Sequence, residues 1–201
     1  MKNLMLIITF LLLIISCNQK PKETNKVEKK ATELELKQLV SDSIIHEFIN
    51  FQISLKNGYS KPYLISDGAE YYYDRDDSLE ILKQDSLFKP EDFKFIFEQI
   101  KFSKKYRFKK EFFNNVILVS SDTLKSLRKP TSDNFWSLFH EKFNSNEYFD
   151  FSMPIFSQDK QIVIIRRGMH CGALCGFGGT YIYIKKKNKW KEIKILNQWI
   201  S

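Results

Sequence analysis

The stretch that most constrains this fold runs from Phe151 to Trp199, where short apolar runs alternate with turn-forming residues. The strand candidates are residues 148–156, 162–165, 180–184 and 190–196. In the third of them aliphatic and aromatic side chains alternate, which is the period of a β-strand. Pro154 fits an edge or bulged strand, because proline cannot donate to a sheet ladder. Four consecutive strands with short connections predict an antiparallel meander.

The helix signals come earlier in the chain. Apolar residues recur at helical intervals over 33–56, after a capping-box spacing at Thr32 and Glu35 and before the stop signal at 57–58. Further helices are predicted over 78–87, 90–100, 121–127 and 132–143, and further strands over 62–65, 69–73 and 116–119, the first two of these as a hairpin. Helices followed by a meander predict a single α+β domain over 32–201, with N-terminal helices packed on an antiparallel sheet.

The N-terminus has the pattern of an export signal. Lys2 precedes an apolar run over 4–15 that is too short to span a bilayer, so residues 1–16 are predicted to be a signal peptide. The run ends in Ser16-Cys17 and resembles the lipobox of bacterial lipoproteins, which predicts lipidation of Cys17 and attachment to a lipid bilayer. An ordinary signal peptide followed by a cysteine is the alternative. The lysine-rich segment over 17–31 is predicted to be a flexible tether spanning about 20 Å.

A family resemblance rests on three groups of residues. They are the run 151–159 around Pro154, the CGxLCGxG segment at 171–178, and two tryptophans, Trp190 and Trp199. Together with the lipobox, this pattern resembles small uncharacterised lipoproteins of Bacteroidota. The resemblance implies the compartment and the fold, and it implies no catalytic residue.

Cys171 and Cys175 are predicted to form a disulfide, because an exported protein folds in an oxidising compartment. Residues four apart on an extended strand lie too far apart for a disulfide, so the segment is predicted to form a tight loop. Three alternatives stay open: free thiols, a redox pair, or a zinc site that includes His170. The spacing differs from that of thioredoxin-type motifs, and no fourth zinc ligand is evident nearby.

No other segment carries an enzyme signature. The alternation of Asp74, Asp76, Ser78 and Glu80 resembles a calcium loop, but Leu79 stands where that loop needs glycine, so a solvated turn and helix cap is the prediction. His46 and His140 fall on predicted helices, where a satisfied or partly exposed histidine is expected. We therefore expect no catalytic residue, no metal and no cofactor.

The chain carries a formal net charge of +8, spread over many lysines. Export argues against nucleic acid as a partner, and a surface near anionic lipid headgroups explains the charge more simply. The sequence favours a non-catalytic binding module on the cell envelope, at the outer membrane, that engages another envelope protein. The expected surface is the glycine-rich loop with its neighbours, namely His170, Gly172, Gly176, Phe177, Gly178 and Tyr181. The alternative is a thiol- or metal-dependent enzyme at His170, Cys171 and Cys175.

Overall fold

The computed structural model describes residues 39–55, 62–68, 73, 75–128, 134–172 and 174–201. All of them belong to one compact unit, Leu36–Ser201. Several sequence predictions lie outside the described residues: the signal peptide, Cys17, the tether, the capping box at 32–35, the stop signal at 57–58 and most of the strand over 69–73.

Among the described residues the helices largely follow the predicted order. They are α3 (Asp42–Ser54), α4 (Arg75–Leu82), α5 (Pro90–Ser103), the 3-10 helix η1 (Lys110–Phe112), α6 (Ser121–Leu127) and α7 (Phe135–Phe143). The long helix predicted over 33–56 is wrong in its extent, because the chain leaves helical geometry at Val40 and Ser41. The Ser41 side chain accepts a hydrogen bond from the backbone N–H of Ile44 and so caps the new helix α3.

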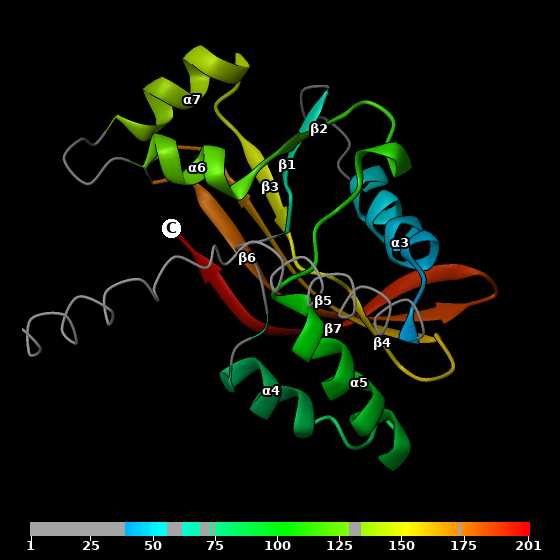
Figure 1. The fold of residues 1–201 in the computed structure, drawn as a ribbon. Helices are drawn as coiled ribbons and strands as arrows, with labels where there is room; N and C mark the ends of the chain where they lie inside the picture. The colour runs from blue at the N-terminus through cyan, green and yellow to red at the C-terminus, as the bar shows by residue number, and fades with distance from the viewer. Residues whose placement is uncertain (1–38, 56–61, 69–72, 74, 129–133, 173) are drawn as a thin grey trace, which may run out of the picture. The chain divides into compact units, whose positions relative to one another are not determined.

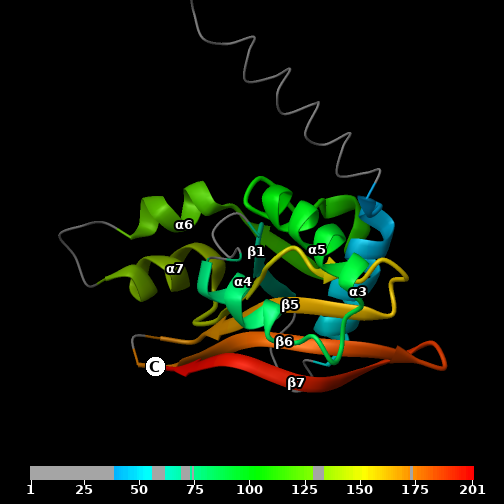
Figure 2. The same cartoon turned by 90° about the horizontal axis from the view of Figure 1, so that it is seen from below.

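Seven strands form one sheet (Figure 1). They are β1 (Tyr63–Ser66), β2 (Val116–Val119), β3 (Tyr148–Phe151), β4 (Ile155–Phe156), β5 (Ile162–His170), β6 (Gly176–Lys186) and β7 (Lys189–Ile200). The order across the sheet is β2-β1-β3-β5-β6-β7, and β4 pairs with β5. The long strands β5, β6 and β7 run side by side and antiparallel (Figure 2), which confirms the predicted α+β class with a C-terminal meander.

The other end of the sheet is parallel, because β1 pairs in parallel with both β2 and β3. The expected hairpin at 66–68 would have given β1 an antiparallel neighbour. Instead, α4 and α5 lie between β1 and β2 in the chain, and α6 and α7 lie between β2 and β3. Long crossovers of this kind are what parallel strands require.

Pro154 divides the first predicted strand into β3 and β4, both of which pair with β5. At the break, Ser152 exchanges two hydrogen bonds with Arg166 of β5. Its backbone N–H donates to the Arg166 carbonyl, and its hydroxyl accepts from the Arg166 N–H, each at 2.9 Å. The Ser152 side chain therefore replaces a ladder bond, as expected for a bulged strand.

The strand register assigns the meander side chains to two faces. One face, called here the Tyr148 face, carries Tyr148, Asp150, Arg166, Gly168, His170, Gly176, Gly178, Thr180 and Trp199. The opposite face, called here the Tyr181 face, carries Arg167, Met169, Phe177, Tyr181, Tyr183, Ile195 and Ile200. Successive residues of a strand point to opposite sides, so neighbours in sequence fall on different faces.

Different helices cover the two faces. α3 packs on the Tyr181 face, where the Phe48 ring lies 5.4 Å from that of Tyr183. α7 packs on the Tyr148 face, where the Phe139 ring lies 5.3 Å from that of Tyr148. α6 and α7 lie together, and α3 lies on the opposite side of both pictures (Figures 1 and 2). α4 also packs on the Tyr148 face, where its Asp77 accepts a hydrogen bond from Arg166.

Candidate functional site

Cys171 and Cys175 are joined by the predicted disulfide, with their Cα atoms 4.9 Å apart. The Cys171 N–H donates to the Cys175 carbonyl at 2.8 Å. Both a disulfide and a backbone hydrogen bond therefore close the turn between β5 and β6. Gly172 lies in this turn with a φ of +125°, a conformation that other residues rarely adopt. Both sulfur atoms are joined in the disulfide.

The loop in the glycine-rich segment is shorter than the sequence suggested. β5 extends to His170 and β6 begins at Gly176, so the turn consists of residues 171–175. Of the residues predicted to bind, His170, Gly176 and Gly178 lie on the Tyr148 face, and Phe177 and Tyr181 lie on the Tyr181 face. The structure therefore divides the predicted binding residues between two surfaces.

On the Tyr148 face, His170 lies between two aromatic rings. Its ring stacks on Tyr148 with centroids 4.8 Å apart and planes 17° apart, and the Trp199 ring lies 5.5 Å away. Trp199 also crosses β6 directly over Gly178, where a Cβ atom would lie 2.6 Å from the indole Nε1. Glycine is needed at position 178 because any side chain would occupy the space of this indole.

Asp150 of β3 completes this cluster. Its Oδ2 lies 2.8 Å from His170 Nε2, within ion-pair distance, although the angles are not those of a hydrogen bond. Among the described residues, four buried side-chain nitrogen or oxygen atoms have no hydrogen-bond partner, and three of them are here: Ser66 Oγ, Asp150 Oδ1 and His170 Nε2. Sequence reasoning missed Asp150 and Ser66. The available signal was a single acidic residue inside the aromatic strand over 148–151.

The Tyr181 face has a hollow beside α3. Its walls are Phe51, Leu55, Arg167, Tyr183, Trp190, Lys191 and Glu192. Arg167 lies 3.9 Å above the Tyr181 ring and donates to Gln52 Oε1 and Glu192 Oε2, each at 2.9 Å. Burial raises the pKa of Tyr183, so its hydroxyl stays protonated and donates to the same Glu192 oxygen at 3.0 Å. The guanidinium is thus fixed in place at the edge of an aromatic hollow.

Further exposed apolar side chains lie on the same face of β6 and β7. Phe177 is 40% exposed, Ile195 43% and Ile200 82%, and the register places all three on the Tyr181 face. Ile193 and Leu55 are also exposed, at the β7 bulge and at the end of α3. These five account for more than half of the nine exposed large apolar residues in the described part of the chain.

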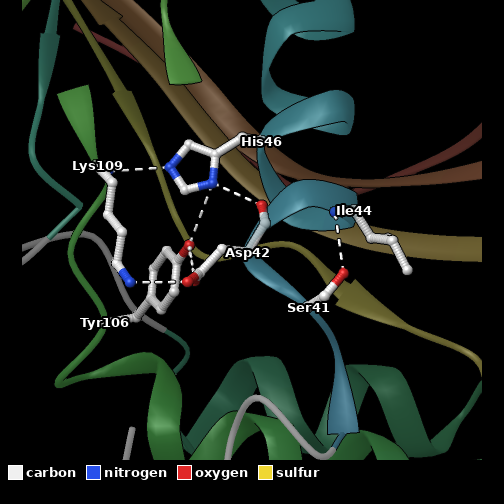
Figure 3. Close-up of polar contacts among 6 residues, drawn as sticks. All are labelled: Ser41, Asp42, Ile44, His46, Tyr106 and Lys109. Carbon is white, nitrogen blue, oxygen red and sulfur yellow. Dashed lines mark hydrogen bonds and ion pairs between the residues drawn. The ribbon is translucent and has the colours of Figure 1, made fainter. Parts of the chain in front are cut away.

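A third polar cluster surrounds His46 on α3 (Figure 3). Its Nε2 accepts the backbone N–H of Lys109 at 2.9 Å, which places the ring proton on Nδ1, 2.7 Å from the Asp42 carbonyl oxygen. Lys109 Nζ and the Tyr106 hydroxyl both donate to the Asp42 carboxylate. Burial lowers the pKa of His46, so the ring is neutral. Both ring nitrogens are used inside the protein, which confirms the expected satisfied histidine and makes this cluster a structural clamp.

The remaining sequence candidates occupy ordinary positions. Asp76, Ser78 and Glu80 lie on helix α4, and Asp74 lies outside the described residues. His140 lies in the last turn of α7. Across the described ranges, no group of three or more His, Cys, Asp and Glu side chains is arranged to hold a metal ion. In the same part of the chain, no helix is both long and apolar enough to cross a membrane.

Comparison with known proteins adds no further constraint. The chain matches no protein-family model, and neither a curated protein nor a solved structure matches it.

Proposed function

We propose that this protein is a lipid-anchored protein of the cell envelope whose folded part is a non-catalytic binding module for another envelope protein. The observation that carries the binding role is the set of apolar groups exposed on the Tyr181 face. This face has both the hollow at Arg167 and the exposed apolar side chains of Phe177, Ile195 and Ile200. Contiguous exposed apolar surface bordered by polar groups is typical of protein-binding sites.

The composition of this surface also favours a protein partner. Trp190 and Arg167 belong to the residue types that most often dominate binding energy at interfaces. Lysines border the same region: Lys191 lines the hollow and Lys189 lines the neighbouring one. A complementary partner would present apolar side chains flanked by Asp or Glu, because opposite charges favour association and correct register.

The anchoring role rests on the N-terminal sequence, in which Cys17 follows an apolar run and a serine. Several acyl chains on one cysteine would attach the protein stably, whereas a single chain would not. Replacing Cys17 with serine should move the protein from the membrane fraction to the soluble fraction or leave an uncleaved precursor. The matched control replaces Cys171 and Cys175 with serine and should leave membrane partition unchanged. Membrane partition that does not depend on Cys17 would contradict the anchor.

The binding role is tested with paired variants on two different surfaces. Ile195→Glu places a charge in the apolar surface of the Tyr181 face, and Ile117→Glu places the same charge at a comparably exposed isoleucine of β2. A specific partner captured from envelope extracts should be lost with Ile195→Glu and kept with Ile117→Glu. It should also be kept when both turn cysteines are replaced by alanine. Equal capture by the two glutamate variants would refute the assignment of this surface.

A further inference from the structure

Among the described residues, two of the three buried carboxylates have hydrogen-bond donors on both oxygens, and Asp150 does not. Asp77 accepts from Arg166 with one carboxylate oxygen and from Thr180 with the other. Asp92 accepts two backbone N–H groups, one on each oxygen. Asp150 is equally buried, at 7% exposure, but its Oδ1 has no hydrogen-bond partner and its Oδ2 has only the His170 contact. A buried carboxylate oxygen without a donor indicates a missing partner, because leaving it unsatisfied is costly.

Within the described ranges, Ser66 carries a second fully buried oxygen atom without a hydrogen-bond partner. Ser152 and Ser157 both use their hydroxyls in hydrogen bonds, to Tyr73 and to Asp159. Ser66, at 1% exposure, has no partner for its hydroxyl. β1 and β3 are parallel with Ile65 opposite Phe149, so Ser66 and Asp150 are neighbours on the same face of the sheet. The two oxygen atoms without partners, a hydroxyl and a carboxylate oxygen, therefore belong to neighbouring residues of adjacent strands.

We propose that Ser66, Asp150 and His170 form a binding site for the ammonium group of a small primary amine. An ammonium carries three N–H donors and a positive charge, and it would meet a carboxylate oxygen and a hydroxyl that lack donors. An anion would be repelled by Asp150. A multivalent metal ion would need more protein ligands than the described residues bring together here.

The surroundings favour a small ligand that enters beside His170. Ser66 and Asp150 are almost fully enclosed, whereas the His170 side chain is 28% exposed and therefore forms the outer wall. The rings of Tyr148 and Trp199 flank His170 and would contact the carbon atoms next to the ammonium. This site lies on the Tyr148 face and is independent of the protein-binding surface on the Tyr181 face.

The test uses the purified full chain in detergent and three chloride salts. Methylammonium is the probe, tetramethylammonium is a cation without N–H donors, and sodium controls for ionic strength. We expect methylammonium alone to cause saturable NMR shifts of the His170 imidazole and the Trp199 indole. Asp150→Asn should weaken this binding about tenfold or more, because it removes a charge-assisted hydrogen bond. Asp122→Asn, at an exposed carboxylate of α6, should leave it unchanged.

Two results would overturn the proposal. One is an equal response to all three cations, or no response to any, which would mean that these atoms hold water only. The other is unchanged methylammonium binding by both Asp150→Asn and Ser66→Ala. The Ser66 variant keeps the test valid if Asp150→Asn does not fold, because removal of an unpartnered hydroxyl is expected to preserve the fold.

Discussion

Replacing Ser66 with alanine is expected to stabilise the protein, and replacing Ser152 with alanine is expected to destabilise it. The two serines are closely matched, since both are buried and both lie in or beside the same sheet. They differ in hydrogen bonding. The Ser66 hydroxyl has no partner, whereas the Ser152 hydroxyl donates to Tyr73 and accepts from the Arg166 N–H, each at 2.9 Å.

The size of each effect follows from this difference. Burying a hydroxyl without a partner costs about 1–3 kcal/mol in proteins, so Ser66→Ala should raise the free energy of unfolding by about 1 kcal/mol, after a small loss of packing. Ser152→Ala leaves the Arg166 N–H and the Tyr73 hydroxyl short of a partner, so it should lower the free energy of unfolding by about 1–3 kcal/mol. For a folded unit of this size, each kcal/mol corresponds to a change in Tm of about 2–4 °C.

Urea denaturation followed by tryptophan fluorescence measures both variants under the same conditions. The midpoint should move up for Ser66→Ala and down for Ser152→Ala, and the slope should stay constant in each case. If Ser66→Ala destabilises the protein as much as Ser152→Ala, the Ser66 hydroxyl has a partner and the reasoning behind the ammonium site is wrong. A gain in stability combined with a loss of methylammonium binding would be the pattern of a group kept for function.

Three further predictions concern stability. Burial lowers the pKa of His46 below its unfolded value near 6.5, so the neutral ring stabilises the fold above pH 6.5. This stability should be lost at up to about 1.4 kcal/mol per pH unit as the pH falls toward the lowered pKa. In the His46→Gln variant, the urea midpoint should therefore change less between pH 7.5 and 5.5 than it does in the native protein. Replacing both Cys171 and Cys175 with alanine should cost roughly 2 kcal/mol of unfolding free energy, equal to the effect of a reductant on the native protein. Gly178→Ala should lower Tm markedly, because its Cβ would lie 2.7 Å from the Arg167 carbonyl oxygen, and an unchanged Tm would contradict the close packing of Trp199.

Local chemistry was enough to predict several parts of this protein. The alternation in the C-terminal strands, the effect of Pro154 and the turn residues around Cys171 and Cys175 act over a few neighbouring residues. The α+β class, the antiparallel meander and the disulfide followed from them. The prediction of one helix over 33–56 was wrong at Ser41. A serine side chain can accept hydrogen bonds from backbone N–H groups and so begin a new helix within an apolar periodic pattern.

The candidate sites were decided by tertiary structure. His170 was visible in the sequence, but its partner Asp150 comes from another strand. Ser66 comes from β1, and long crossovers separate β1 in the chain from the parallel strands that pair with it. A shift of one residue in register would have turned any of these side chains to the opposite face. The sequence determines which residues can form strands, whereas the pairing between distant strands decides which side chains meet, because that pairing depends on contacts far apart in the chain.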